Sequence, residues 1–270
     1  MNFISHNNGL PNLVIIGAMK CGTTSLHHYL NRHPEIHMSA TKELDFFIEE
    51  KNWKRGVNWY QSQFKSFTKI IGESSPNYTK YPIFKNVPKR MHRIIPDAKL
   101  IYLVRDPVKR ALSHYMHQYT ARCDSRTVDE AFSTLENNHY IQCSLYGKQL
   151  EYFLNYYSLS NILIMSLEEL SQKRSESLTR IFRFLDVDPN FDHPDFSSIF
   201  HQSQQKERLT AFGACLYKLP MGGRFASLFS SLVSEAVRQP KINRRRYQQI
   251  LDFLKEDIQH FKKLTNYDVF

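Results

Sequence analysis

The chain has 270 residues, of which 41% are hydrophobic, and a formal net charge of +10. This length suffices for one sizeable hydrophobic core, so two independent domains are not expected. No apolar run approaches the ~20 residues of a membrane-spanning helix, and the first residues lack the pattern of a secretory signal, so we expect a soluble cytoplasmic protein. The positive charge favours an anionic partner, which charge alone does not identify: nucleic acid, a membrane surface, or a phosphorylated cofactor or substrate.

Short apolar runs alternate with amphipathic stretches along the chain. Strands are predicted at 13–16, 69–72, 99–104 and 161–166. Helices are predicted at 23–31, 84–95, 107–119, 144–157, 175–185 and 247–264, and loops with one or two helices at 188–240. Strands and helices alternating at these lengths indicate an α/β fold: a single domain over residues 12–270, after an extension at 1–11, with a P-loop-type central parallel sheet flanked by helices on both faces.

The cysteines and histidines do not form a metal-binding pattern. The four cysteines are scattered without a CxxC pair, so we interpret them as free thiols: Cys21, Cys123, Cys143 and Cys215. Four of the twelve histidines lie close together, but without an HExxH or comparable ligand spacing: His27, His28, His33 and His37. No metal site is therefore predicted.

The segment Gly17–Ser25 lies between a predicted strand and a predicted helix, where backbone N–H groups and the helix N-terminus can bind an anion. A nucleotide-hydrolysing P-loop has lysine directly after its second glycine, but that position is Thr23 here, and the lysine is Lys20. A lysine there can neutralise charge on the bridging oxygen of a phosphosulfate as that bond breaks. Cys21 is interpreted as a small filler rather than a nucleophile, because no His or Asp is close in sequence.

A second anion site is predicted after the strand at 99–104. Arg105 follows this strand and offers a bidentate fork to a phosphate, and Ser113 adds a hydroxyl about two helical turns later. A Mg²⁺-dependent nucleotide hydrolase would need an acid at this point. Asp106 is interpreted instead as the cap of the next helix, because Pro107 follows it.

Together these motifs resemble the PAPS-dependent sulfotransferases, which use 3′-phosphoadenosine-5′-phosphosulfate (PAPS), and in particular the branch of heparan-sulfate-type and bacterial enzymes. That branch has a loop of the form MKxGTT, matched by Met19–Thr24. The resemblance implies PAPS as sulfuryl donor, its product adenosine-3′,5′-bisphosphate (PAP), and no metal. It also implies a donor-binding set, with Lys20 at the 5′ end and Arg105 and Ser113 at the 3′-phosphate: Lys20, Cys21, Gly22, Thr23, Thr24, Ser25, Arg105 and Ser113.

The same branch has a Glu-x-x-Phe-Phe segment followed by Gly-x-x-Trp-Tyr, which resembles Glu43–Phe47 and Gly56–Tyr60. The resemblance implies that Glu43 is the catalytic base, since sulfuryl transfer needs the acceptor's proton removed. Glu43 as an ordinary loop carboxylate, or paired with Lys42, is the alternative. His114 is a weaker alternative base.

Two positions depart from the branch. Asp45 stands where some relatives have histidine, and is interpreted as a second polar contact or a turn residue. Ser74 replaces a lysine of a Glu-Lys-x-Pro-x-Tyr segment. The loss of this cation argues against carrying over a heparan-type acceptor.

The resemblance therefore implies transfer of a sulfuryl group from PAPS to a hydroxyl or amine of a small-molecule, glycolipid or carbohydrate acceptor. A P-loop kinase and a non-catalytic adenosine-nucleotide-binding relative are the alternatives. A nucleic-acid partner is not expected, because no known nucleic-acid-binding signature is present. Lys206 or Arg208 is a possible phosphate contact or a solvated charge, and Arg244–Arg246 is interpreted as a helix start.

Overall fold

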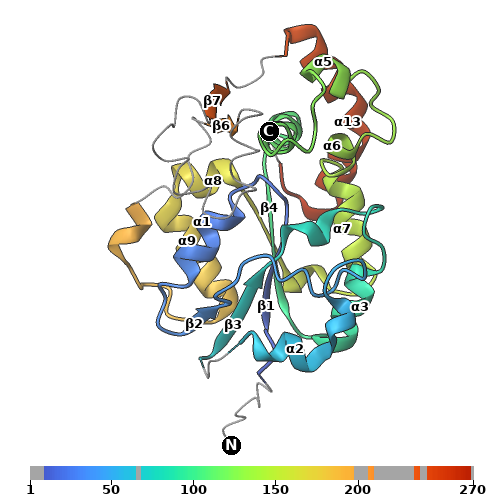
Figure 1. Ribbon diagram of the computed structural model, residues 1–270. Helices are drawn as coiled ribbons and strands as arrows, with labels where there is room; N and C mark the ends of the chain where they lie inside the picture. The colour runs from blue at the N-terminus through green and yellow to red at the C-terminus, as the bar shows by residue number, and fades with distance from the viewer. Residues whose placement is uncertain (1–8, 65–67, 198–205, 210–233, 238–241, 269–270) are drawn as a thin grey trace, which may run out of the picture.

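The computed structural model describes residues 9–64, 68–197, 206–209, 234–237 and 242–268. Its centre is a five-stranded parallel sheet with the order β2-β3-β1-β4-β5 (Figure 1). The strands are β1 Leu13–Gly17, β2 Ile36–Met38, β3 Ile70–Ser74, β4 Lys99–Val104 and β5 Ile162–Ser166. All residues of β1, β3 and β5 are buried, as in a parallel sheet covered on both faces.

Helices cover both faces of this sheet, with α1 and α9 on one side and α3, α7 and α13 on the other (Figure 1). The α-helices are α1 Thr23–Leu30, α2 Gly56–Ser62, α3 Val87–Ile94, α4 Pro107–Thr120, α5 Val128–Ala131, α6 His139–Gln142, α7 Tyr146–Leu154, α8 Leu167–Gln172, α9 Arg174–Leu185 and α13 Arg244–Thr265. Short 3₁₀ turns occur at η1 Trp53–Arg55, η2 Pro76–Thr79, η3 Leu159–Asn161 and η4 Pro194–Ser197. A separate antiparallel pair consists of β6 Lys206–Leu209 and β7 Ser234–Val237.

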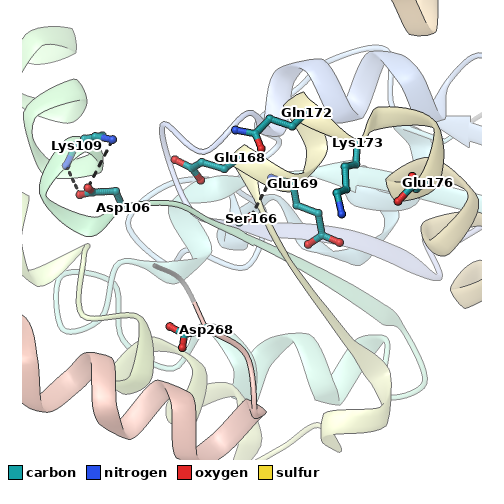
Figure 2. Close-up of a pocket in the computed structure, with 9 residues that line it drawn as sticks. All are labelled: Asp106, Lys109, Ser166, Glu168, Glu169, Gln172, Lys173, Glu176 and Asp268. Carbon is teal, nitrogen blue, oxygen red and sulfur yellow. Dashed lines mark hydrogen bonds and ion pairs between the residues drawn. The ribbon is translucent and has the colours of Figure 1, made fainter.

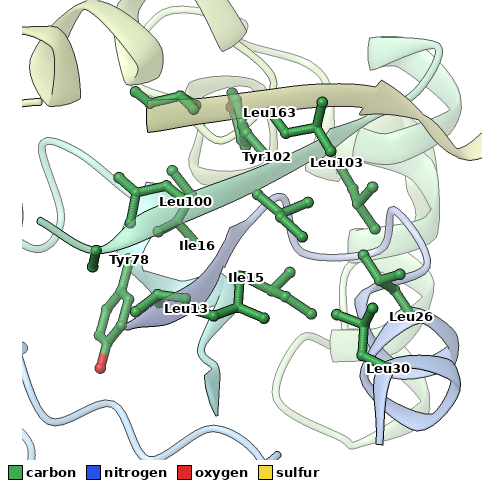
Figure 3. Packing of buried hydrophobic residues seen from close by; sticks show 14 of the residues in the cluster. Leu13, Ile15, Ile16, Leu26, Leu30, Tyr78, Leu100, Tyr102, Leu103 and Leu163 are labelled. Carbon is green, nitrogen blue, oxygen red and sulfur yellow. The ribbon is translucent and has the colours of Figure 1, made fainter. Parts of the chain in front are cut away.

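The main core lies between the sheet and its helices. Figure 3 shows Leu26 and Leu30 of α1 beside the buried side chains of β1 and β4. Each fully buried Leu or Ile side chain contributes about 1.5–3 kcal/mol relative to an exposed one. A second cluster joins α4, α5, α6 and α13, and includes Val108, Tyr115, Phe132, Tyr140, Ile141, Ile250 and Leu254.

Tyrosines near the two ends of helix α13 form hydrogen bonds at the ends of β4 and β5, and we call these bonds the α13 brace. Near its start, Tyr247 Oη donates to Asp106 Oδ2 at 2.6 Å. After its end, Tyr267 Oη accepts from the Ser166 backbone N–H at 2.8 Å and donates to Glu169 Oε2 at 2.7 Å. The helix thus contacts the segments that follow both strands.

The topology places a ligand site at the carboxyl ends of β1 and β4. These strands are neighbours, but the chain leaves β1 toward β2 and β3 and leaves β4 toward β5. Ligands of open α/β sheets bind in the crevice at such a switch point. The two loops that follow these strands contain the two predicted anion motifs.

The predicted fold class is confirmed, and the predicted strands and the C-terminal helix are present with small shifts. Two helices are shorter than expected: α3 begins at Val87 because Asn86 has a left-handed backbone (φ 60°), and α7 begins at Tyr146. Strand β2 and helices α2, α5, α6 and α8 were not predicted. Residues 198–205 and 210–233, within the segment expected to hold loops and helices, lie outside the described residues. None of the helices that the structure describes is long and apolar enough to cross a membrane.

Candidate functional site

The phosphate loop connects β1 to α1, as predicted. Lys20 and Gly22 have left-handed backbones, with φ of 72° and 85°. A Cβ on Gly22 would lie 2.7 Å from Leu167 Cδ1, so this position needs glycine for both its conformation and its space. Helix α1 begins directly after it, at Thr23. The loop therefore directs the first N–H groups of an eight-residue helix toward the switch point.

Arg105 joins the second motif to this loop. Its Nη1 donates to the Lys20 carbonyl oxygen at 3.3 Å. Its Nε is buried and has no hydrogen-bond partner among the residues described. Ser113 is half-buried on α4, two turns further along. The predicted 5′ and 3′ sites thus lie on adjoining segments.

Asp106 caps α4, which confirms the sequence interpretation. Its Oδ1 accepts hydrogen bonds from the backbone N–H groups of Val108 and Lys109, both at 2.9 Å. The other oxygen, Oδ2, accepts the bond from Tyr247. Both carboxylate oxygens of Asp106 therefore accept hydrogen bonds, one from the first turn of α4 and the other from α13.

Glu43 lies beyond the carboxyl end of β3. Its backbone N–H donates to the Ser74 carbonyl oxygen at 2.9 Å, and its φ is 62°. The side chain is 47% exposed and accepts a hydrogen bond from Lys42 Nζ at 2.8 Å. Partial burial opposes ionisation, but the hydrogen bond from Lys42 and the charges of Lys42, Lys51 and Lys80 outweigh it and lower the pKa of Glu43. Glu43 is therefore a carboxylate at neutral pH, and the pairing with Lys42 that was the alternative to a catalytic role is present.

Asp45 is a buried anchor of the same loop. One of its oxygens, Oδ2, forms an ion pair with Lys51 and accepts from Asn77 Nδ2 at 2.8 Å. Its backbone N–H donates to Ser75 Oγ at 3.0 Å. Of the two predicted roles, these contacts favour the turn residue.

Glu73 is linked to Asp45 through the Ser75 hydroxyl. It was not recognised as a functional candidate from the sequence. Ser75 Oγ donates to its Oε2 at 2.6 Å, and Tyr60 and Tyr78 donate to its Oε1 at 2.6 and 2.8 Å. Complete burial raises the pKa of Glu73 to about 7, against the lowering effect of these hydrogen bonds. The Gly-Glu-Ser-Ser-Pro-Asn-Tyr segment was noted in the sequence, but the partner Tyr60 comes from α2 and shows only in the fold.

Cys21 and His114 are both enclosed. Burial raises the pKa of Cys21 to about 11, despite the opposing charges of Arg110 and Arg105, and its Sγ lies 3.7 Å from Tyr146 Oη. Cys21 is thus a neutral thiol, in accord with its interpretation as filler. His114 has no exposed surface and faces Arg110, His139 and Tyr140. None of these contacts joins it to Glu43 or the phosphate loop.

A cavity of about 530 Å³ lies beside the phosphate loop, at the carboxyl ends of β4 and β5 (Figure 2). Its lining contains five carboxylates and two lysines: Asp106, Glu168, Glu169, Glu176 and Asp268, with Lys109 and Lys173, and also Ser166 and Gln172. Leu167, which packs on Gly22, precedes Glu168. An acidic lining repels phosphate, so phosphates fit the loop and Arg105 better than this cavity.

Two other sequence predictions concern basic residues in the last third of the chain. Lys206 and Arg208 lie on β6, where only the backbone is described. Helix α13 begins at Arg244 with Asn243 as its cap, so the interpretation of Arg244–Arg246 as a helix start is confirmed.

The fold is that of an α/β protein of the P-loop type, with the two predicted anion motifs joined at the carboxyl edge of its sheet. The family model of the sulfotransferase domain matches residues 10–209. The chain belongs to this family of transferase enzymes, as the motifs indicated.

Relatives agree with this assignment. A membrane-associated sulfotransferase, kil1, from Dictyostelium discoideum is 38% identical over 133 residues, which are 47% of this chain and 27% of the relative. Heparan sulfate glucosamine 3-O-sulfotransferase 5 from Mus musculus is 30% identical over 192 residues, 67% of this chain and 54% of the relative. The chain thus spans about a quarter to a half of these relatives. A sulfotransferase structure from Alicyclobacillus acidocaldarius shares the fold, with a TM-score of 0.73, 23% identity and 96% coverage of each chain.

Proposed function

We propose that this protein transfers a sulfuryl group from PAPS to a hydroxyl or amine of a small-molecule, glycolipid or carbohydrate acceptor, releasing PAP, without a metal. The observation that carries the proposal is the contact between Arg105 and the Lys20 carbonyl, which joins a 5′-type and a 3′-type anion motif at the sheet's switch point. The family assignment supports the reaction class.

The donor would be held by residues of the two loops. Backbone N–H groups and hydroxyls of Cys21–Ser25, with the α1 N-terminus, suit the 5′-phosphosulfate. Arg105, whose buried Nε lacks a hydrogen-bond partner in the described part of the chain, and Ser113 suit the 3′-phosphate. Lys20 is assigned to the bridging oxygen, where negative charge develops on the leaving phosphate.

Glu43 is assigned to the acceptor. Its carboxylate takes the acceptor's proton as the acceptor oxygen or nitrogen bonds to sulfur, while the bond from sulfur to the bridging oxygen breaks and its electrons remain on the phosphate. Glu43 is ionised at neutral pH and so can accept a proton, although its lowered pKa makes it a weaker base than an ordinary carboxylate. The buried Asp45 and Glu73 hold the loop that positions it.

The acceptor and the location in the cell remain proposals. The relative from Dictyostelium discoideum is named as membrane-associated, and the relative from Mus musculus is named for heparan sulfate. These properties belong to the relatives. A cytoplasmic location and the absence of a nucleic-acid partner are kept as predictions from the sequence.

The test is transfer of labelled sulfate from PAPS to a panel of alcohols, phenols, sugars and amines, with and without EDTA. We expect turnover that EDTA does not affect. Activity that EDTA abolishes and Mg²⁺ restores, or phosphate transfer from ATP, would favour the kinase alternative. PAP binding without turnover on any acceptor would favour the non-catalytic relative.

A further inference from the structure

A group of cationic and polar side chains lies where α4 meets α6, and Lys80, which follows η2, acts on it through its charge. We call the group the α4–α6 cluster: Lys80, Arg110, His114, His139 and Cys143. The His114 and His139 rings are 4.8 Å apart between centroids. Nitrogen atoms of these two rings and Cys143 Sγ all lie within 4.8 Å of one another. His139 is exposed, so the cluster reaches the solvent.

Two members are buried cations that form no ion pair with a carboxylate of the described residues. Arg110 is fully buried and donates to Ser144 Oγ at 2.6 Å and to the Tyr140 carbonyl oxygen, both neutral acceptors. Lys80 is 7% exposed and forms no ion pair with a described carboxylate, although the charge of Asp45 acts on it. Buried charges are normally paired, because removing an ion from water is costly. The cluster therefore has an excess of positive charge that an anion would compensate.

His114 has a buried hydrogen-bond donor with no partner among the described residues. Burial first, and then the charges of Arg110 and Lys80, lower the pKa of His114 far below its usual range, so the ring is neutral. Arg110 Nη1 lies 3.4 Å from its Nδ1, and a guanidinium can only donate. Nδ1 is therefore the acceptor and Nε2 carries the proton. This Nε2–H is buried and has no acceptor within the described structure.

The three side chains could be mistaken for a metal site, but their charges and protons argue otherwise. A protonated Nε2 has no lone pair to offer a metal. Arg110 and Lys80 would repel a cation, and both charges already act on His139, whose pKa is lowered to about 4 mainly by burial. Burial also raises the pKa of Cys143, so its sulfur stays a thiol. A neutral donor beside two cations suits an anion.

Charges of the cluster act on the proposed transfer centre. Lys80 follows η2, directly after β3, and its charge contributes to the lowered pKa of Glu43. Arg110 acts in the same way on Cys21 of the phosphate loop. Lys80 therefore supplies positive charge near the base, although Ser74 lacks the lysine found there in the resembling branch.

We propose that the α4–α6 cluster is an anion-binding subsite that holds a carboxylate or sulfate group of the acceptor beside the position where the sulfuryl group is received. Lys80 and His114 Nε2–H donate to this anion, His139 lines its entrance, and Arg110 fixes the His114 ring. The assignment to the acceptor rests on the proposed function; the binding of an anion does not.

The first test titrates inorganic sulfate into the full-length protein saturated with PAP, followed by calorimetry. Saturation with PAP occupies the two phosphate positions but leaves the sulfuryl position open, so a further event is assigned to the cluster only where Lys80→Met weakens it. We expect one such event in the wild type, weakened about tenfold or more in Lys80→Met, because a charged hydrogen bond is lost. Lys80→Arg keeps the charge and should retain most of the binding.

The matched control is Lys85→Met, which removes an exposed lysine five residues away and should bind sulfate as the wild type does. The proposal is overturned if the PAP-saturated wild type binds no sulfate, or if Lys80→Met binds it equally well. Stoichiometric Zn²⁺ binding that His139→Ala abolishes would also overturn it, in favour of a metal site.

The second test compares each acceptor found in the panel with its analogue lacking the carboxylate or sulfate. We expect a higher kcat/KM for the anionic form, and a loss of this preference by about tenfold or more in Lys80→Met but not in Lys85→Met. A preference for neutral acceptors, or one that Lys80→Met leaves intact, counts against the subsite. Absence of both PAP binding and transfer would instead refute the proposed function, and the sulfate titration of the wild type and Lys80→Met would then be made without PAP.

Discussion

Arg105 Nη1 lies 3.3 Å from the carbonyl oxygen of Lys20, across a separation of 85 residues in the sequence. A substitution of Arg105 therefore removes a hydrogen bond to the phosphate loop as well as a side chain of the second motif. The predictions below separate what each motif contributes.

Arg105→Ala should selectively remove the contribution of the 3′-phosphate. The wild type should bind PAP more tightly than AMP, which lacks that phosphate, by about 1.5–3 kcal/mol for a charged hydrogen bond. Calorimetry with PAP, AMP and ATP measures the difference, and the variant should bind PAP and AMP with similar affinity. Equal affinities of the wild type for PAP and AMP would refute the 3′ site.

Lys20→Ala should lower kcat strongly and PAPS affinity less. Lys20 is assigned to charge that appears only as the bridging bond breaks, so its loss affects the transition state more than the bound donor. Steady-state kinetics and PAP calorimetry on the same variant give the two effects. A loss of affinity as large as the loss of rate would make Lys20 a simple binding residue.

Glu43→Gln should reduce the transfer rate by about 10²–10⁴-fold, as loss of a general base does, while PAP binding persists. The pKa of Glu43 is lowered, so wild-type activity should fall only when the pH drops below the ordinary carboxyl range, and Glu43→Gln should abolish this acidic limb. Lys42→Met removes the main hydrogen bond that lowers this pKa, and should move the limb to higher pH. Near wild-type turnover in Glu43→Gln would direct attention to Asp45 or His114.

Glu73→Gln should flatten the pH dependence of stability. The pKa of Glu73 is about 7 in the folded protein and near 4.5 when unfolded, so between these values the folded state binds the additional proton. The stability contributed by Glu73 is thus present below about pH 4.5 and is lost as the pH rises through about 7. Thermal unfolding across this range should show a decline for the wild type that Glu73→Gln lacks. Exposed Glu136 offers the control Glu136→Gln, which should keep the decline.

The local motifs were predictable from sequence because their signals are local. The phosphate loop combines an apolar strand, glycines and a helix start within about 25 residues, and Arg105 follows another apolar strand. The cap formed by Asp106 was likewise indicated by the adjacent Pro107. Each of these interpretations needed no partner from elsewhere in the chain.

Features that depend on distant partners escaped prediction. Strand β2 has three residues with a histidine in the middle, and only its pairing with β3 identifies it. The predicted helix at 144–157 begins later because Ser144 instead donates to the Pro107 carbonyl and accepts from Arg110. The burial of Glu73 and Lys80 also depends on segments remote in sequence, so neither side chain was recognised as a candidate.

The brace formed by α13 bears on how the protein is made. Tyr247 bonds to Asp106 across 141 residues, and Tyr267 bonds to Glu169 across 98. During synthesis, the sheet and both phosphate motifs leave the ribosome before this helix does. The ends of β4 and β5 therefore acquire these hydrogen bonds after translation of the other described helices, and a nascent chain that lacks α13 and Tyr267 would lack them.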